Sequence, residues 1–302
     1  MRIGVAATPD VAIPTLDWLI ASKHDLVLVI TQPDKPAGRG RAIKQSVVGD
    51  WAAARDIPTV KPESSDDLIG VINDLDCVVT IGYGVLLPEN ILDLPKHGFI
   101  NLHFSLLPAY RGAAPAQRAL QNGESVTGVS VFQLEKGMDT GPIYSQRSIE
   151  IDPKWRSFEL LQRLAQEGPS AVDEALSMIS TGKSPNVQHG EASLAPKITK
   201  HDAMLKFSDD AKTLVNAIRA FTYEPGAWCT WNNEPFKITA ATIAQDFPLK
   251  QGEIFVDGQR VVVGCAGTSS LTLLTVVPAG KKEMSAADWA RGARLKGGES
   301  FG

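Results

Sequence analysis

The first half of the chain alternates between short apolar runs and stretches with helical spacing, and this rhythm limits its fold more than any other feature. Residues 2–7, 26–31, 76–82 and 98–104 are the apolar or alternating runs. Helix-like stretches such as 11–22 and 64–74 separate them. Strands that alternate with helices usually pair side by side in one parallel sheet. The first half therefore predicts an α/β fold with a doubly wound, mainly parallel sheet.

The sequence that follows adds two strands and a long helix. Residues 126–134 and 142–150 have the pattern of strands, and a loop containing Asp139 joins them. Residues 157–180 place apolar side chains at helical intervals, which predicts one long helix. Gly168 and Pro169 interrupt that pattern, so we expect a kink or a break there.

A change of pattern near residue 183 indicates a second domain. Residues 184–202 lose all periodicity and are predicted to be a linker. Beyond them, a helix is expected near 209–220. Short β-like runs then follow at 227–231, 235–243, 252–256, 260–265 and 270–277. Evenly spaced short strands favour a small barrel. The predicted domains are 1–183 and 203–302.

Three polar side chains share one side of the predicted strand at residues 98–104. Side chains alternate between the two faces of a strand, so Asn101, His103 and Ser105 point the same way. Pro108 cannot continue a strand ladder, which places these residues near the carboxyl end of the strand. Ligands of open α/β sheets bind at that end.

Asn101, His103 and Asp139 together could move an acyl group between nitrogens. The Asn101 amide can donate to a developing oxyanion, which contributes roughly 3 kcal/mol in comparable sites. His103 could add a second donor or carry a proton. Asp139 could orient the ring, hold an imidazolium charge or take a proton from the attacking amine. From spacing alone, however, Asn-x-His is also compatible with a structural role and Asp139 with an ordinary turn residue.

Several motifs resemble those of the folate-dependent formyltransferases. The main one runs from Asn101 to Pro115 and reads NLHFSLLPAYRGAAP. Further similar segments are Ala7 to Asp10, Thr31 to Gly40, Gly82 to Pro88 and Pro278 to Ser285. Both halves of the chain therefore carry the resemblance. It is greatest to the family members that act on methionyl-tRNA.

The resemblance implies a function, a cofactor and a second fold. The formyl donor would be 10-formyltetrahydrofolate, and the acceptor the α-amino group of methionyl initiator tRNA. Asn101, His103 and Asp139 match the family's catalytic trio, and the second domain would be OB-like. Two alternatives are a formyltransferase for an amino sugar or another small amine, and an RNA-binding module that kept an inactive catalytic fold.

Two sets of binding residues complete the prediction, the tRNA set mainly from clusters of basic side chains, with the resemblance supporting Arg39. The folate site would lie along two segments, with the residues Gly82, Tyr83, Leu86, Pro88, Ser105, Leu106, Leu107 and Pro108. Backbone groups there could bond a pterin, and the leucines could offer apolar walls. The tRNA site would draw on the basic side chains Lys35, Arg39, Arg41, Lys44, Lys281 and Lys282, although such charge runs are also common in solvated loops.

Composition removes several other classes of protein. The net charge of −4 argues against an indiscriminate nucleic-acid binder, so RNA contacts must come from local patches. No Gly-x-Gly-x-x-Gly follows the first strand, so NAD(P) is not expected even in a Rossmann-like sheet. Three widely spaced cysteines lack metal-ligand spacing and are expected to be free and buried, and no metal is predicted. Neither a membrane segment nor an obligatory protein partner is expected, and the predicted location is the cytoplasm.

Overall fold

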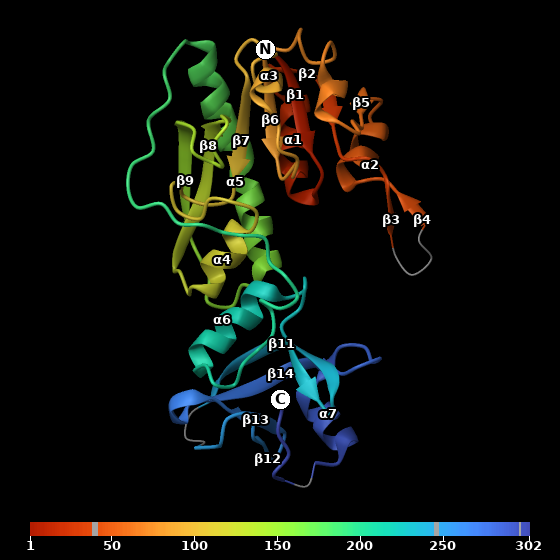
Figure 1. The fold of residues 1–302 in the computed structure, drawn as a ribbon, viewed down its shortest axis with the longest axis vertical. Helices are drawn as coiled ribbons and strands as arrows, with labels where there is room; N and C mark the ends of the chain where they lie inside the picture. The colour runs from red at the N-terminus through yellow and green to blue at the C-terminus, as the bar shows by residue number, and fades with distance from the viewer. Residues whose placement is uncertain (38–41, 245–247, 296) are drawn as a thin grey trace. The chain divides into compact units, whose positions relative to one another are not determined.

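The computed structural model describes residues 1–37, 42–244, 248–295 and 297–302, and its chain forms two compact units (Figure 1). Unit 1 comprises Met1–Pro115, Val126–Glu150 and Leu161–Pro196, and unit 2 comprises Ala116–Ser125, Ile151–Leu160 and Lys197–Gly302. Two short segments that precede residue 161 thus belong to the same unit as Lys197–Gly302. The limits 1–183 and 203–302 stay a prediction.

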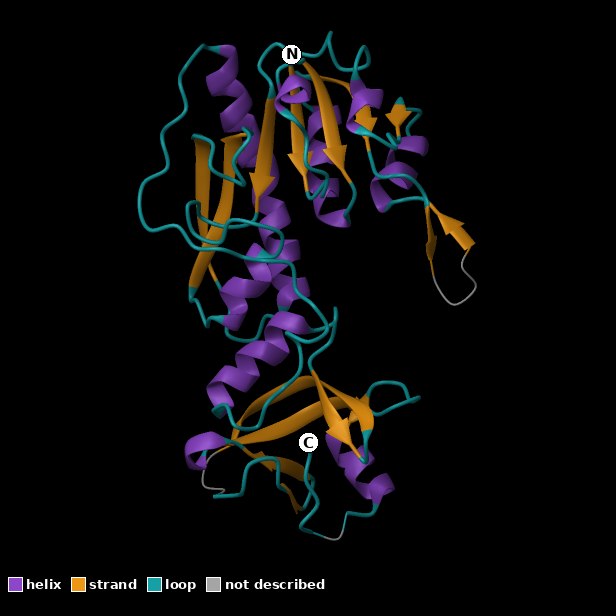
Figure 2. Cartoon of the chain, viewed as in Figure 1, coloured by secondary structure: helices purple, strands orange, loops and turns teal. Residues whose placement is uncertain are grey.

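A seven-stranded sheet forms the centre of unit 1, in the order β5-β2-β1-β6-β7-β8-β9 (Figure 2). Its strands are β1 (Arg2–Ala7), β2 (Asp25–Ile30), β5 (Thr59–Val60), β6 (Cys77–Ile81), β7 (Phe99–His103), β8 (Val126–Gln133) and β9 (Ile143–Glu150). Neighbouring strands from β5 to β7 pair in parallel. β8 pairs antiparallel with β7, and β9 pairs antiparallel with β8. The predicted doubly wound, mainly parallel sheet is confirmed.

Helices and loops cover both faces of the parallel strands, which explains why all five residues of β6 are buried. On one face, α5 (Ser157–Ser180) packs closely. A Cβ on Gly168 of this helix would lie 2.5 Å from Oγ1 of Thr15 and 2.8 Å from Cδ2 of Leu102. The opposite face carries an apolar cluster that includes Phe99. Leu102 therefore points toward α5, and Asn101 and His103 point away from it.

The long helix α5 does not break where its sequence suggested. It continues from Ser157 to Ser180 with Pro169 inside it. Proline removes one backbone donor from the ladder but leaves the remaining turns intact. Apolar residues on both sides of Pro169, including Leu164 and Val172, are completely buried. Burial of this apolar stripe holds the helix together, so no break forms at Pro169, and the kink stays a prediction.

The helix expected at residues 64–74 is mostly absent. Only a short 3-10 helix, Ser65–Leu68, forms, and turns follow it. Ile69 already has extended backbone angles, and Gly70 has a φ of +81° that a helix cannot accommodate. The helical prediction fails because glycine ends the segment after one turn.

Shorter elements complete unit 1. A 3-10 helix, Asp10–Ala12, leads into α1 (Ile13–Ala21), and α2 (Val47–Ala53) and α3 (Glu89–Leu92) follow later in the chain. A small antiparallel hairpin consists of β3 (Lys35–Ala37) and β4 (Ala42–Lys44). Helix α4 (Pro115–Gln121) lies almost entirely in the part of the chain assigned to unit 2.

Part of the predicted linker is bonded to unit 1. Asn186 and Ile143 exchange backbone hydrogen bonds of 2.7 and 2.8 Å. Near the other end, Ala195 donates to the carbonyl of Arg111 at 2.7 Å and accepts from Ala114 at 3.1 Å. We call residues 186–195 the strap. Backbone hydrogen bonds hold it near both of its ends, although its sequence has no periodicity.

Unit 2 combines helices with an antiparallel sheet. Helix α6 (Ala211–Phe221) precedes a sheet in the order β10-β11-β14-β13-β12, with β15 paired to β14. The strands are β10 (Trp228–Trp231), β11 (Glu234–Ala244), β12 (Ile254–Asp257), β13 (Arg260–Gly264), β14 (Ser270–Val277) and β15 (Met284–Ser285). A 3-10 helix, Ala266–Thr268, and α7 (Ala286–Ala293) complete it. The predicted β-rich second half is confirmed.

The described strands of unit 2 do not form a closed ladder, because β10 and β12 remain at opposite edges of the sheet. The last residues of the chain bond to both edges. Gly302 exchanges backbone hydrogen bonds with Thr230 in β10, and Glu299 accepts one from Ile254 in β12. The end of the chain therefore covers the two open edges, where a closed barrel would pair them directly.

The three cysteines Cys77, Cys229 and Cys265 are free and buried, as predicted. Burial raises the pKa of the Cys77 and Cys265 thiols to about 12, so neither forms a thiolate near neutral pH. Of the helices in the described residues, none combines the length and apolar character needed to cross a bilayer.

The buried ring of His24, just before β2, should make the stability of the fold decrease in acid. Its side chain is buried, and neither ring nitrogen has a hydrogen-bond partner among the described residues. Burial, followed by the amino terminus and Lys23, lowers its pKa below the ordinary 6.5. The unfolded chain therefore binds a proton first as pH falls, and stability is lost from about pH 6.5 downward.

We expect His24→Phe to reduce this pH dependence, because phenylalanine keeps the ring beside Trp18 and removes the titration. It should also raise the free energy of unfolding at neutral pH by about 1 kcal/mol, since unpartnered buried polar groups are removed. Chemical denaturation between about pH 5 and 8 measures both effects. An unchanged pH slope in the variant would contradict the assignment.

Candidate active site

The polar residues of β7 lie at its carboxyl end, as their sequence predicted. Asn101 and His103 share the face away from α5, and the strand ends at His103. Asn101 is half-buried, and among the described residues no side-chain hydrogen bond occupies its amide. Its NH₂ group is therefore available to a bound molecule. This face is largely enclosed at the end of the strand, where His103 is only 6% exposed.

The ring of His103 is held by contacts on two sides. Its Nε2 lies 2.9 Å from the carbonyl oxygen of Tyr110. A carbonyl only accepts, so Nε2 must carry the proton and donate. The other nitrogen, Nδ1, lies 3.7 Å from Oδ2 of Asp139, too far for a direct hydrogen bond. Phe132 meets the ring edge-on with a centroid distance of 6.3 Å. Nδ1 is thus the nitrogen that can react.

A hydrogen bond and close packing hold the loop that carries Asp139. Asp139 has a left-handed φ of +52°, and its Oδ2 accepts a 2.7 Å hydrogen bond from the backbone nitrogen of Gly112. A Cβ on Gly137 would overlap Thr140 Oγ1, and one on Gly141 would overlap the carbonyl oxygen of Gln133. Both glycines are therefore needed for the close packing of this loop.

The direction of β8 explains why this loop has such an unusual course. Ile100 pairs with Gln133, and His103 pairs with Ser130. The antiparallel β8 therefore ends beside the start of β7. The residues after Gln133 must therefore run toward the carboxyl end of β7 to bring Asp139 to His103, because these two side chains meet at that end.

Hydrogen bonds from the sheet fix the segment that follows β7. Ser105 Oγ donates to the carbonyl of Ala109 at 2.6 Å. Ser130 Oγ donates to the carbonyl of Ser105 at 2.7 Å and accepts from the nitrogen of Leu107 at 3.0 Å. Gln146 Nε2 donates to the carbonyl of Leu107 at 2.9 Å. This network presents Tyr110 and Gly112 to the two catalytic candidates, His103 and Asp139.

Opposing influences set the protonation of His103. Burial lowers its pKa, and the nearby Asp139 carboxylate and the Tyr110 carbonyl oppose that effect. The net direction is downward, so the ring is mainly neutral near pH 7. A neutral ring that donates through Nε2 has a lone pair at Nδ1. The site therefore contains a base next to a carboxylate that can stabilise the resulting positive charge.

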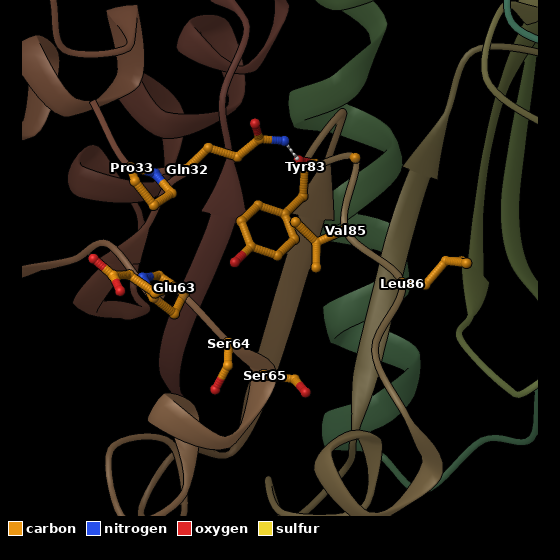
Figure 3. Close-up of a pocket in the computed structure, with 10 residues that line it drawn as sticks. Gln32, Pro33, Glu63, Ser64, Ser65, Tyr83, Val85 and Leu86 are labelled. Carbon is orange, nitrogen blue, oxygen red and sulfur yellow. Dashed lines mark hydrogen bonds between the residues drawn. The ribbon is translucent and has the colours of Figure 1, made fainter. Parts of the chain in front are cut away.

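A cavity of about 330 Å³ opens at the same edge of the sheet. Its lining comes from the ends of β2 and β6 and from a nearby loop, and consists of Gln32, Pro33, Pro62, Glu63, Ser64, Ser65, Tyr83, Gly84, Val85 and Leu86. Figure 3 shows the Tyr83 ring pointing into the group formed by Pro33, Glu63 and Val85, while Leu86 stands apart. The strand order reverses at this point, because the chain continues from β1 to β2 on one side and later returns to β6 on the other side, and open α/β sheets bind ligands at such switch points.

The predicted folate residues lie in two different environments. Tyr83 and Leu86 line the cavity, and Gly82 and Pro88 are exposed close to them in sequence. In contrast, Ser105, Leu107 and Pro108 are buried, and Leu107 packs with Phe132 and Ile143. Leu106 is half-buried against Gly128. In this second segment, the side chains mainly serve the fold, and the backbone is the part left to contact a ligand.

Four of the six predicted RNA-binding residues lie in the described part of the chain. Lys35 and Lys44 are exposed and pair with each other across the β3–β4 hairpin. Lys35 Nζ donates to Gln32 Oε1 at 2.6 Å, and Gln32 Nε2 donates to the carbonyl of Tyr83 at 2.7 Å. The base of the hairpin is thus connected to the cavity. Arg39 and Arg41 lie outside the described residues. In unit 2, Lys281 and Lys282 are exposed between β14 and β15.

Several residues of the site were not anticipated. They are Gln32, Pro62 to Ser65, Ser130, Gln146 and Gln188. Gln188 lies in the strap, and its Nε2 donates at 2.8 Å to the carbonyl oxygens of both Asp139 and Gly141. No local pattern distinguishes these residues, because each contacts a segment far away in the sequence. Within the described residues, no group of histidine, cysteine and acidic side chains could hold a metal ion.

Known proteins resemble this chain along nearly its whole length. The methionyl-tRNA formyltransferase of Salinispora tropica is 44% identical over 309 residues, covering 99% of each chain. Among solved structures, the sugar 3N-formyl transferase WlaRD, crystallised with dTDP and 5-N-formyl-THF, has a TM-score of 0.71 at 20% identity and covers 93% of this chain and 99% of its own. The methionyl-tRNA formyltransferase of Clostridium thermocellum has a TM-score of 0.58 at 17% identity, with coverages of 88% and 100%.

The two structural likenesses are below 25% identity and support the fold alone. Family membership comes from sequence. Residues 1–176 match the formyl transferase family, and residues 197–294 match the formyl transferase C-terminal domain. These matches cover both the site on β7 and the antiparallel sheet of unit 2. The amide, the neutral imidazole and the carboxylate described above lie within the first match. The chain therefore belongs to the formyl transferase family.

Proposed function

We propose that this protein transfers the formyl group of 10-formyltetrahydrofolate to the α-amino group of methionyl initiator tRNA. The identity of 44% over 99% of both chains with a protein named methionyl-tRNA formyltransferase carries this proposal. The geometry of Asn101, His103 and Asp139 supports it, because these groups suit the attack of an amine on a carbonyl carbon. The reaction would take place in the cytoplasm, where charged tRNA is used.

In the proposed reaction, the acceptor amine supplies the nucleophile, and the folate supplies an activated formyl carbon. The free NH₂ of Asn101 donates to the formyl oxygen as negative charge develops on it. This interaction strengthens in the transition state and so lowers the barrier. The protein needs no nucleophile of its own, and the three cysteines, with protonated buried thiols, take no part.

The proton lost by the attacking amine goes to Nδ1 of His103. Nε2 is already committed to the Tyr110 carbonyl, so Nδ1 has the only free lone pair on the ring. Asp139, 3.7 Å away, stabilises the imidazolium that forms. The same nitrogen can then return the proton to the departing folate nitrogen. Atoms and charge balance, since one N–C bond forms as another breaks.

The folate is proposed to bind along Gly82 to Pro88 and Ser105 to Pro108. A cavity of about 330 Å³ near the first segment is within the size range of small-molecule sites. The exposed apolar side chains of Val85 and Leu86, 42% and 88% exposed, would be covered by a bound ring system. The buried second segment would contribute backbone donors and acceptors only.

The tRNA is proposed to contact the hairpin residues Lys35 and Lys44 together with Arg39 and Arg41, and to contact Lys281 and Lys282 in unit 2. Exposed lysines contact phosphates without reading sequence, so these residues would position the RNA. Because Gln32 connects Lys35 to the Tyr83 carbonyl, the hairpin leads directly to the cavity.

Substrate acceptance tests the proposal. Purified protein is incubated with 10-formyltetrahydrofolate and either methionyl initiator tRNA or a nucleotide-linked amino sugar, and formylation of each amine is followed by mass spectrometry. We expect formylation of the tRNA and a kcat/KM at least about 10³-fold lower for the sugar nucleotide, because it lacks the extended phosphate backbone that the proposed lysine contacts require. Preference for the sugar would establish the alternative acceptor, and formylation of neither would refute the transferase function.

A further inference from the structure

The loop of Asp139 is clamped by a residue from the strap. Gln188 Nε2 donates to the carbonyl oxygens of Asp139 and Gly141, each at 2.8 Å. Both amide protons are thus used on a single loop, on either side of Thr140. A planar amide that bonds two carbonyls fixes their separation as well as their position. The clamp therefore restrains the backbone from which the Asp139 carboxylate extends.

Arg111 fixes the orientation of this amide. Its Nη2 donates to Gln188 Oε1 at 2.6 Å. A guanidinium can only donate and backbone carbonyls can only accept, so a flipped amide would lose all three bonds. The contact also has a charged donor, which makes it stronger than a neutral hydrogen bond. The side-chain amide of Gln188 is consequently held in one orientation.

The strap holds the opposite side of the site as well. Ser193 Oγ accepts from the nitrogen of Tyr110 at 2.9 Å, and its carbonyl accepts from the nitrogen of Arg111 at 2.8 Å. Tyr110 provides the carbonyl that binds His103 Nε2. One segment of the strap thus fixes the backbone next to the imidazole, and another fixes the loop of the carboxylate.

We propose that Gln188 is a positioning residue for formyl transfer and that the strap sets the separation between Asp139 and His103. This inference rests on the proposed function of the trio. Gln188 touches neither reacting group and acts through the Asp139 loop. The strap is therefore part of the catalytic apparatus, although its sequence has the character of a linker.

The test compares Gln188→Met with wild type. Methionine keeps the length of the side chain and removes all three hydrogen bonds. We expect kcat for formyl transfer to fall roughly 10- to 100-fold, the loss that a misplaced catalytic group produces, while KM for both substrates changes by less than about threefold. Val187→Ala is the matched control, since this neighbouring side chain is 71% exposed and its loss should leave kcat unchanged.

The pH profile separates positioning from a merely structural role. Asp139 raises the pKa of His103, so displacing the carboxylate should lower that pKa and move the acid limb of kcat/KM to lower pH in Gln188→Met. A variant that loses only stability, with unchanged kcat and an unchanged acid limb, would overturn the inference.

A second variant keeps the test decisive if methionine prevents folding. Gln188→Glu retains an acceptor for Arg111 and loses the two donors to the Asp139 loop, so kcat should again fall roughly tenfold or more. Wild-type kcat in Gln188→Glu would overturn the proposal. Wild-type protein that formylates no acceptor would instead refute the proposed function, so the two failures are distinguishable.

Discussion

Alanine in place of His103 is expected to lower kcat/KM for formyl transfer by about 10²- to 10³-fold. The substitution removes the proton acceptor at Nδ1 and the positive charge that Asp139 would stabilise. It also removes the hydrogen bond between the His103 ring and the Tyr110 carbonyl, so circular dichroism and the unfolding transition should be compared with wild type. Single-turnover rates of formyl transfer measure the loss directly.

His97→Ala is the control for this variant. His97 lies before the start of β7, whereas His103 lies at its end, so its loss should leave the rate unchanged. Wild-type kcat/KM should decline as pH falls through the His103 pKa, which burial places below 6.5, and His103→Ala should lack this decline. A near-normal single-turnover rate in His103→Ala would remove the imidazole from the mechanism.

Gly141→Ala should lower kcat/KM by about 10²-fold or more by displacing the Asp139 carboxylate, because a misplacement of about 1 Å in a catalytic group has that effect. The added methyl group would overlap the backbone oxygen of Gln133, which no side-chain rotation can relieve. The loop must shift, taking with it the Asp139 carboxylate and the carbonyl that Gln188 binds. Steady-state kinetics and thermal unfolding measure the two consequences, and we expect a loss of stability of about 1–3 kcal/mol.

Gly182→Ala serves as the comparison. Gly182 has a φ of +69° and open space around its Cβ position, so alanine there brings only backbone strain, about 1 kcal/mol. Its kcat/KM should match wild type. If Gly141→Ala were as active as Gly182→Ala, the close packing of the Asp139 loop would have no catalytic significance.

Local geometry explains which features the sequence could predict. The alternation in β7 correctly placed Asn101 and His103 on one face, because side-chain direction in a strand depends only on position along it. The longer strands of both halves were also predicted to within a few residues, since burial on a sheet imposes a clear pattern, whereas the short strands β3, β4, β5 and β15 were missed. Asp139 joined the predicted trio mainly through family resemblance, yet it is indeed close to His103.

Features that depend on distant contacts were not predictable in this way. Gln188 and Asp139 are separated by 49 positions, and nothing near either residue signals their hydrogen bond. The helix expected at 64–74 failed at Gly70, and of the kink or break expected at Pro169 no break forms, because tertiary burial outweighs one lost hydrogen bond. The loop of Pro62 to Ser65, which lines the cavity, was assigned no role for the same reason.

The reversal of direction between β7 and β8 turns the connection from Leu134 to Pro142 into a spacer. Its residues must run from the start of β7 to its carboxyl end, so their number determines whether the Asp139 carboxylate reaches His103. The number of residues in this connection matters more than the identity of its side chains. Redesign of the enzyme for other acceptors could therefore vary exposed side chains such as Met138, but the chain length of this connection has to be conserved.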